Sequence, residues 1–159
     1  MLRKNLKSKK NKTTGRFALI ASTYNTKYVD AMLHAASAEL KRAGAEVQII
    51  RVPGAFEIPA VAAKLARAEE PFAALICLGV ILRGQTDHAQ QIANGVSNAL
   101  AQLQILFALP VIHEVLLLEN KEQAQVRCLD KKHNRGTEAA QTALAMAKVM
   151  KSINKQSTD

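Results

Sequence analysis

The sequence has 159 residues, of which 48% are hydrophobic, a length and composition typical of one globular domain with its own core. No run approaches the roughly 18 to 20 apolar residues that span a bilayer, and no apolar stretch follows the basic N-terminus, so we expect a cytosolic protein. Two cysteines without zinc-like spacing argue against a disulfide framework or a metal site, and a chain of net charge +9 without tryptophan lacks a base-stacking surface for nucleic acid.

The positive charge is concentrated in residues 1–12, which hold six of the 22 basic residues and no acidic one. A short block of like charge is typically a solvated tail. We therefore interpret residues 1–15 as a basic flexible arm and residues 16–159 as a single domain. Binding of an anionic partner is the alternative role for the arm, and the remaining sequence favours neither nucleic acid nor a membrane as a partner.

Four short β-rich runs alternate with segments of helical periodicity along the domain. The predicted strands lie at residues 16–21, 47–52, 72–78 and within 109–118. The predicted helices lie at residues 29–43, 58–68, 92–103, after 120, and at 137–153. Gly44 is a natural stop for the first helix, and Pro59 is tolerated in the first turn of the second. Asn120 with Gln123 resembles a capping box that opens a helix.

The run FAALICL at residues 72–78 is nearly all apolar, as expected for a parallel strand covered on both faces. The alternation of strands and helices predicts an α/β fold of three layers, in which helices cover both faces of a parallel four-stranded sheet. In open sheets of this kind, ligands bind beyond the carboxyl ends of the strands. The residues that follow each strand are therefore the candidates for a site.

Small, polar or turn-forming residues follow each predicted strand. They lie at residues 22–25, 52–57, 79–88 and 119–120. Any one of these segments is consistent with ordinary loop sequence. Because the carboxyl ends of parallel strands meet at one edge of a sheet, the four segments together predict a cleft.

The third of these segments, residues 79–88, carries the most information. Gly84 lets the backbone approach a ligand closely. Gln85 and Thr86 stand where the next helix is predicted to begin, so their N–H groups can point at an anion. Neither a Walker A nor a G-x-G-x-x-G pattern is present, so a single phosphate on a small metabolite fits better than a nucleotide. His88, one turn into the predicted helix, is either a proton-transfer group or a hydrogen-bonded structural residue.

Four motifs stand in a fixed order along the domain. They are VPGAFEIP at residues 52–59, GVILRGQTDH at 79–88, PVI at 110–112, and Arg127 followed by NRG at 134–136. In order and spacing they resemble the lumazine synthase family, from about residue 16 to residue 153. The first two motifs are the most specific part of the resemblance.

The resemblance implies a flavodoxin-like fold and an enzyme of riboflavin biosynthesis that needs no cofactor and no metal. Enzymes of this family condense 5-amino-6-(ribitylamino)uracil with 3,4-dihydroxy-2-butanone 4-phosphate and release phosphate and water. They assemble as pentamers, some of which build larger shells, and each active site lies between neighbouring subunits. The implied partners are small-molecule substrates, further copies of this chain and, in shell-forming relatives, riboflavin synthase.

The resemblance also implies roles for individual residues. Tyr24 corresponds to an aromatic residue that stacks on the pyrimidine, and His88 corresponds to the proton-transfer residue. Gln85 and Thr86, with Arg127 from the adjacent subunit, correspond to the phosphate-binding residues. The residues implied at the uracil and ribityl end of the substrate are Tyr24, Asn25, Ala55, Phe56, Glu57, Val80, Ile81, Leu82, His113 and Arg135.

Two residues and one turn depart from the family's pattern. His113 replaces a bulky apolar residue, Arg135 replaces a common lysine, and residues 129–133 replace a glycine-containing turn. His113 has two interpretations, as a wall of the neighbouring subunit's pocket or as a hydrogen-bonded interface residue. A non-catalytic, flavin-binding and shell-forming paralogue is the alternative function. It would keep the fold and Tyr24 but lose turnover, and the presence of His88 argues against it.

Overall fold

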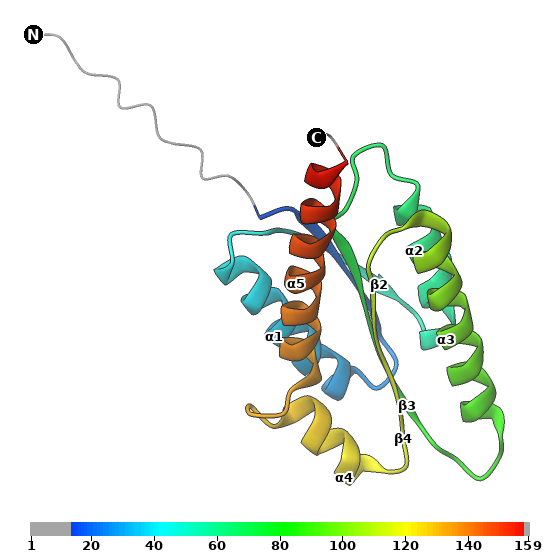
Figure 1. Cartoon of the computed structure of the whole chain (residues 1–159). Coiled ribbons are helices and arrows are strands. Elements are labelled where there is room, and N and C mark those ends of the chain that lie inside the picture. Colours follow the sequence, from blue (N-terminus) through cyan, green and yellow to red (C-terminus); the bar gives the residue numbers. More distant parts are fainter. Residues whose placement is uncertain (1–13, 158–159) are drawn as a thin grey trace, which may run out of the picture.

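The structure, a computed structural model, describes residues 14–157 as one four-stranded parallel sheet flanked by helices (Figure 1). The strands are β1 (Arg16–Ser22), β2 (Glu46–Val52), β3 (Ala74–Leu82) and β4 (Val111–Leu118). The helices are α1 (Thr26–Arg42), α2 (Ile58–Ala66), α3 (His88–Phe107), α4 (Lys121–Ala124) and α5 (Arg135–Gln156), with a 3₁₀ turn at Ala55–Glu57 and a π-helical turn at Gln125–Leu129. Residues 1–12 lie outside the described part of the chain, so their interpretation as an arm stays a prediction.

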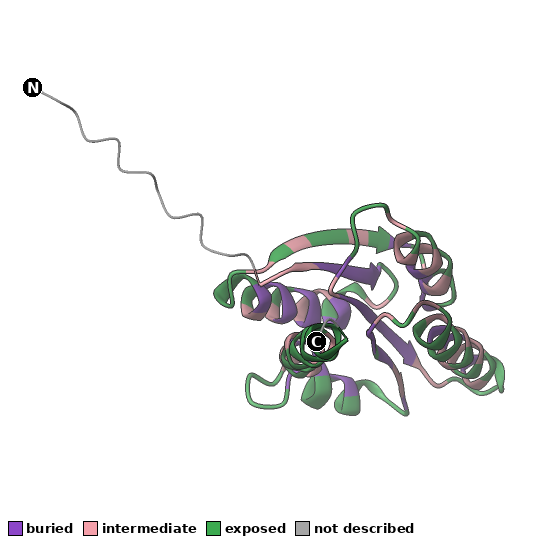
Figure 2. Ribbon diagram, turned by 45° about the horizontal axis from the view of Figure 1, so that its top comes forward, coloured by how far each residue is buried: buried purple, intermediate pink, exposed green. Residues whose placement is uncertain are grey.

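The sheet has the strand order β2-β1-β3-β4, and helices cover both of its faces. Helices α1 and α5 lie on one face and helices α2 and α3 on the other (Figures 1 and 2). Successive residues of β1 point to opposite faces, as the period of a strand requires. Phe17 and Leu19 join the core under α1 and α5, whereas Ala18 and Ile20 join the core under α2 and α3. This arrangement confirms the predicted three-layer, flavodoxin-like α/β fold.

Strand β3 is longer than the sequence predicted. It continues through Leu82, so Gly79 to Leu82, which were expected in a loop, belong to the strand. The cause is β4, whose whole length pairs with β3 from Leu75↔Val111 to Leu82↔Leu118. Gly79 lies within the strand rather than in a turn, and a Cβ at this position would make a tight contact of 3.2 Å with a methyl carbon of Val115.

Helix α3 begins at His88, before the predicted helical segment 92–103 but after Gln85 and Thr86, where its start was also expected. Asp87 occupies its N-cap position and His88 is its first residue, rather than a residue one turn inside it. Gln85 and Thr86 therefore lie in the connection that precedes the helix. The prediction of a capping box at α4 is correct for one of its two bonds. The Asn120 Oδ1 atom accepts the Gln123 N–H at 2.9 Å, but Gln123 Oε1 accepts from the backbone of Glu119 instead of Asn120.

Helices α1 and α5 approach each other most closely at Gly136, in the first turn of α5. A Cβ built on Gly136 would lie 2.0 Å from the carbonyl oxygen of Met32 in α1. Asn134, the N-cap of α5, holds this contact in place. Its Oδ1 atom accepts the Gly136 N–H at 2.8 Å, and its Nδ2 atom donates to the Cys128 carbonyl at 2.7 Å. The turn that precedes α5 is thus attached to the body of the fold at a point where no side chain fits.

We predict that Gly136→Ala lowers the free energy of unfolding by about 3 kcal/mol, since the new methyl group must displace backbone rather than a flexible side chain. Gly84→Ala is the matched control, because a Cβ at Gly84 has no heavy atom within 4 Å. Chemical denaturation of both variants measures the difference. Equal stability of the two variants would contradict the close approach of α1 and α5.

Candidate active site

A cavity of about 970 Å³ opens at the carboxyl edge of the sheet. Its walls come from the residues after β1, from the 3₁₀ turn after β2, from the end of β3 and from the first two turns of α3. Ten of the predicted site residues line it: Tyr24, Asn25, Ala55, Phe56, Glu57, Val80, Ile81, Leu82, Thr86 and His88. The structure therefore brings together three of the four predicted strand-end segments, whereas the fourth, residues 119–120, does not line the cavity.

The first two turns of α3 also contribute lining residues that were not predicted from the sequence. These are Gln91, Ile92 and Gly95, which follow His88 at spacings of three, four and seven. That spacing places them on the helix face that carries His88, so the helical period was the signal that could have found them. The ring of Phe56 lies against α3 at Gly95, where a Cβ would be 3.0 Å from Phe56 Cε2.

Two aromatic rings are open to solvent at the cavity. Tyr24 is 74% exposed and Phe56 is 61% exposed, values that are unusual for large aromatic side chains in a folded domain. Both residues line the cavity, so their exposed faces belong to its surface. A flat aromatic or heteroaromatic ligand can recover the apolar contacts that these rings lack in the free protein.

The connection between β3 and α3 combines an uncapped helix N-terminus with an arginine that is already engaged. The N-cap residue Asp87 makes no capping bond, and Thr86 Oγ1 accepts only the His88 N–H, at 3.4 Å, so the other N–H groups of the first turn of α3 remain suited to an anion. The guanidinium of Arg83 is already hydrogen-bonded within the chain. Its Nε atom donates to Glu119 Oε1 and one terminal nitrogen donates to Gln90 Oε1, both at 2.9 Å. Asp87 adds a carboxylate at the same helix end. An anion bound here therefore needs a further cation.

Four predicted site residues do not line this cavity: Gln85, His113, Arg127 and Arg135. Gln85 is exposed in the connection before α3. Arg127 lies in the π-helical turn between α4 and α5, where it is exposed and has no ion-pair partner among residues 14–157. His113 and Glu114 line a second, smaller hollow of about 550 Å³ along the edge strand β4.

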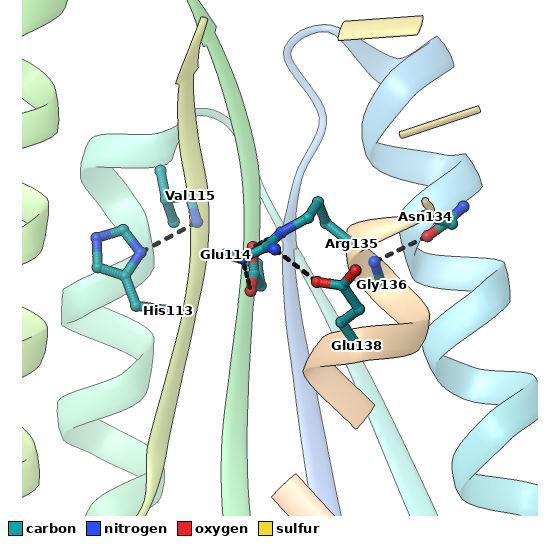
Figure 3. Close-up of polar contacts among 7 residues, drawn as sticks. All are labelled: His113, Glu114, Val115, Asn134, Arg135, Gly136 and Glu138. Carbon is teal, nitrogen blue, oxygen red and sulfur yellow. Dashed lines mark hydrogen bonds and ion pairs between the residues drawn. The ribbon is translucent and has the colours of Figure 1, made fainter. Parts of the chain in front are cut away.

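Arg135, the first residue of helix α5, bonds to Glu114 of strand β4 and to Glu138 of its own helix (Figure 3). Its Nε and Nη2 atoms donate to the two oxygens of Glu114 at 3.1 and 3.0 Å, and its Nη1 atom donates to Glu138. Glu114 is only 7% exposed, and this burial raises the pKa of its carboxyl above the ordinary value even though the Arg135 guanidinium acts in the opposite direction. The guanidinium nitrogens of Arg135 are therefore all hydrogen-bonded to carboxylates of the same chain.

His113 lies on β4, where the Val115 N–H donates to its ring (Figure 3), and both of its ring nitrogens have hydrogen-bond partners. The Val115 N–H donates to Nδ1 at 3.1 Å, so the neutral ring carries its proton on Nε2, which lies 2.7 Å from Ser97 Oγ. Desolvation by the surrounding protein lowers the pKa of His113 below its ordinary value. Of the two interpretations of His113, a hydrogen-bonded residue at an edge agrees with these contacts.

Both cysteines are buried and unsuited to nucleophilic chemistry. Burial raises the pKa of Cys77 to about 12 and that of Cys128 to about 11, so both remain thiols at neutral pH. Within residues 14–157, no group of three His, Cys, Asp or Glu side chains is placed to hold a metal ion. In the same part of the chain, the helices are too short or too polar to cross a membrane.

The fold and the cavity define an α/β protein with a large cavity at the carboxyl edge of a flavodoxin-like sheet. The family model of 6,7-dimethyl-8-ribityllumazine synthase matches residues 14–151. The chain is 37% identical over 143 residues to the 6,7-dimethyl-8-ribityllumazine synthase of Stenotrophomonas maltophilia (strain R551-3), covering 88% of this chain and 92% of the relative. It is 38% identical over 141 residues to the enzyme of that name from Desulfotalea psychrophila, covering 87% and 90%. The chain therefore belongs to the lumazine synthase family, the transferases of riboflavin biosynthesis.

The contacts of His113 predict its titration. Its lowered pKa means that the neutral ring stabilises the fold fully above pH 6.5, and that this contribution is lost as the pH falls through the folded-state pKa. We expect ¹⁵N NMR to show the proton on Nε2 and a titration below pH 6.5, with His113→Phe identifying the signal. The same variant should lose part of the decline in unfolding free energy below pH 6.5. A proton on Nδ1 at neutral pH would contradict the assigned contacts.

Proposed function

We propose that the protein condenses 5-amino-6-(D-ribitylamino)uracil with 3,4-dihydroxy-2-butanone 4-phosphate to form 6,7-dimethyl-8-ribityllumazine, with release of phosphate and water. The observation that carries this proposal is the cavity, which collects two exposed aromatic rings, a carboxylate, an imidazole and an uncapped helix N-terminus in a chain of this family. Its volume of about 970 Å³ is in the range of small-molecule sites and leaves room for two reactants.

The uracil substrate occupies the aromatic side of the cavity in this proposal. Tyr24 stacks on the pyrimidine ring, and the backbone of Leu82, which faces away from β4, meets its polar edge. Glu57, exposed at the cavity after β2, accepts hydrogen bonds from the ribityl hydroxyls. These roles use side chains that the fold already holds at one edge of the sheet, so binding requires little rearrangement of the backbone.

The phosphorylated substrate binds at the connection before α3. The backbone around Gln85 and Thr86 and the first turn of α3 supply N–H donors. Arg83 is held by Glu119 and Gln90, and Asp87 is acidic, so this chain brings no unengaged arginine to the phosphate. We propose that Arg127 of an adjacent copy supplies the missing charge.

Assembly as a homo-oligomer follows from the same placement. Arg127, His113 and Arg135 all lie outside the cavity of their own chain, and the last two lie along the edge strand β4. We propose that this edge completes the site of a neighbouring copy, so that each active site is shared between two subunits. An isolated subunit would then bind the uracil substrate but would lack the residue that holds the phosphate.

The reaction depends more on holding the two reactants in position than on acid–base catalysis. The substrate amine forms a Schiff base with the carbonyl and releases water, phosphate leaves by elimination, and the second nitrogen closes the ring on the remaining carbonyl with loss of another water. Holding the two reactants side by side removes much of the entropic barrier. His88, at the first position of α3 and exposed to the cavity, moves protons between these steps. The absorbance of the lumazine product, measured with purified protein and both substrates, tests the proposal directly, and its absence would reject it.

We predict that His88→Ala lowers kcat about 10- to 100-fold, at the low end of acid–base contributions because positioning survives. KM for both substrates should change less than kcat. His34→Ala is the matched control, since His34 is exposed on α1 away from the cavity and should leave kcat unchanged. An unaltered kcat for His88→Ala across the pH range would make His88 a structural residue.

We predict that Arg127→Ala weakens binding of the phosphorylated substrate by roughly 1.5 to 3 kcal/mol, the range for hydrogen bonds to charged groups. The guanidinium can bind two phosphate oxygens at once, and no other group replaces it. KM for the uracil substrate should move much less, and inhibition by inorganic phosphate should weaken. Arg42→Ala, at an exposed i,i+3 ion pair on α1, is the control. Equal effects on both substrates would assign Arg127 to the subunit interface instead.

A further inference from the structure

The turn between β1 and α1 carries Tyr24 and is attached to two neighbouring strand ends. Toward β2, the Thr23 N–H donates to the Val52 carbonyl at 2.8 Å and the Tyr24 N–H donates to the Pro53 carbonyl at 3.1 Å. Toward β3, the Asn25 side chain donates through Nδ2 to the Val80 carbonyl at 2.7 Å. Within residues 14–157, the Asn25 amide makes the single hydrogen bond from Thr23, Tyr24 or Asn25 to β3.

Asn25 occupies the N-cap position of α1 without capping the helix. Its backbone is left-handed, with φ 56° and ψ 42°, and its side chain accepts no hydrogen bond from the first turn. An N-cap asparagine usually bonds to the N–H groups of that turn, so the bond to Val80 replaces the ordinary one. Asparagine tolerates a left-handed backbone better than most residues. In this conformation its side-chain amide bonds to the carbonyl of Val80 in β3, at the wall of the cavity.

We propose that Asn25 is a positioning residue, whose amide fixes the β1–α1 turn to β3 and thereby holds the Tyr24 ring at the cavity. Tyr24 itself is 74% exposed, so its ring has few contacts of its own that could keep it in place. The Val80 carbonyl is used by the protein for this bond, and the Ile81 backbone faces β4 in the strand ladder, so the backbone of Leu82 remains for the substrate. The proposal rests on the proposed function only in taking Tyr24 as the residue that contacts the uracil substrate.

Two substitutions separate the amide from the backbone conformation. Asn25→Asp keeps the size of the side chain but places a carboxylate oxygen opposite the Val80 carbonyl, where two acceptors repel. Asn25→Gly keeps the left-handed backbone accessible and removes the amide. Asn94→Asp is the matched control for charge, because Asn94 is exposed on α3, bonds only to Gln90 and does not line the cavity.

Tyr24 can report its own mobility. The chain has two tyrosines and no tryptophan, so in a Tyr28→Phe background Tyr24 is the only strong intrinsic fluorophore. Time-resolved anisotropy then follows nanosecond motion of its ring in the assembled protein. We expect a larger fast component in Asn25→Asp and Asn25→Gly, and no change in Asn94→Asp. An unchanged decay in both Asn25 variants would overturn the proposal.

Kinetics of the same variants, without the Tyr28 substitution, distinguish positioning from general loss of structure. We expect KM for the uracil substrate to rise roughly three- to tenfold, as for the loss of part of an aromatic stacking contact. KM for the phosphorylated substrate should change less than twofold, and the unfolding midpoint of Asn25→Gly should stay near that of the parent. Equal rises for both substrates would overturn the proposal. A parent protein without lumazine formation would reject the proposed function instead, and the anisotropy would still decide the role of Asn25.

Discussion

The rest of the structure depends on the burial of β3 on both of its faces. Eight of the nine residues of this strand are buried, between β1 on one side and β4 on the other. A central parallel strand can be buried in this way only if helices cover both faces, and each parallel connection must then return along the sheet through a helix. Because every strand runs in the same direction, the loops that follow the strands all meet at one edge. The cavity is a consequence of that geometry.

Electrostatics explains why the cavity looks incomplete within one subunit. The connection before α3 offers N–H groups to an anion, but its nearest arginine, Arg83, is held by Glu119 and Gln90. Arg135 is likewise engaged, by Glu114 of the edge strand β4 and by Glu138 of α5. Arg127 is exposed and has no ion-pair partner among the residues that the structure describes. A phosphate and the Asp87 carboxylate are both negatively charged. An arginine from another copy is the simplest source of the positive charge that would compensate them.

Most of the candidate site could be predicted because it consists of short segments next to strands. Tyr24, Phe56 and Thr86 each follow a recognisable strand, and the sheet rule alone places them together. His113 and Arg135 could not be placed in the same way, since their hydrogen bonds join β4 to α3 and to α5 across long stretches of sequence. The role of Asn25 was hidden for the same reason, because its partner Val80 is 55 positions away.

The sequence by itself determined the fold class, the order of its elements and the loops that carry the site. Hydrophobic periodicity and turn residues are local signals, and they are sufficient for a doubly wound sheet with short connections. Only the tertiary structure decided where β3 ends, where α3 begins and which polar groups at the cavity remain free to bind a ligand. Pairing with β4 extends β3 through Leu82, and the backbone of Met32 leaves no room for a side chain at Gly136. These outcomes depend on contacts between distant segments, and a strand or a glycine has the same local sequence whether or not such a contact forms.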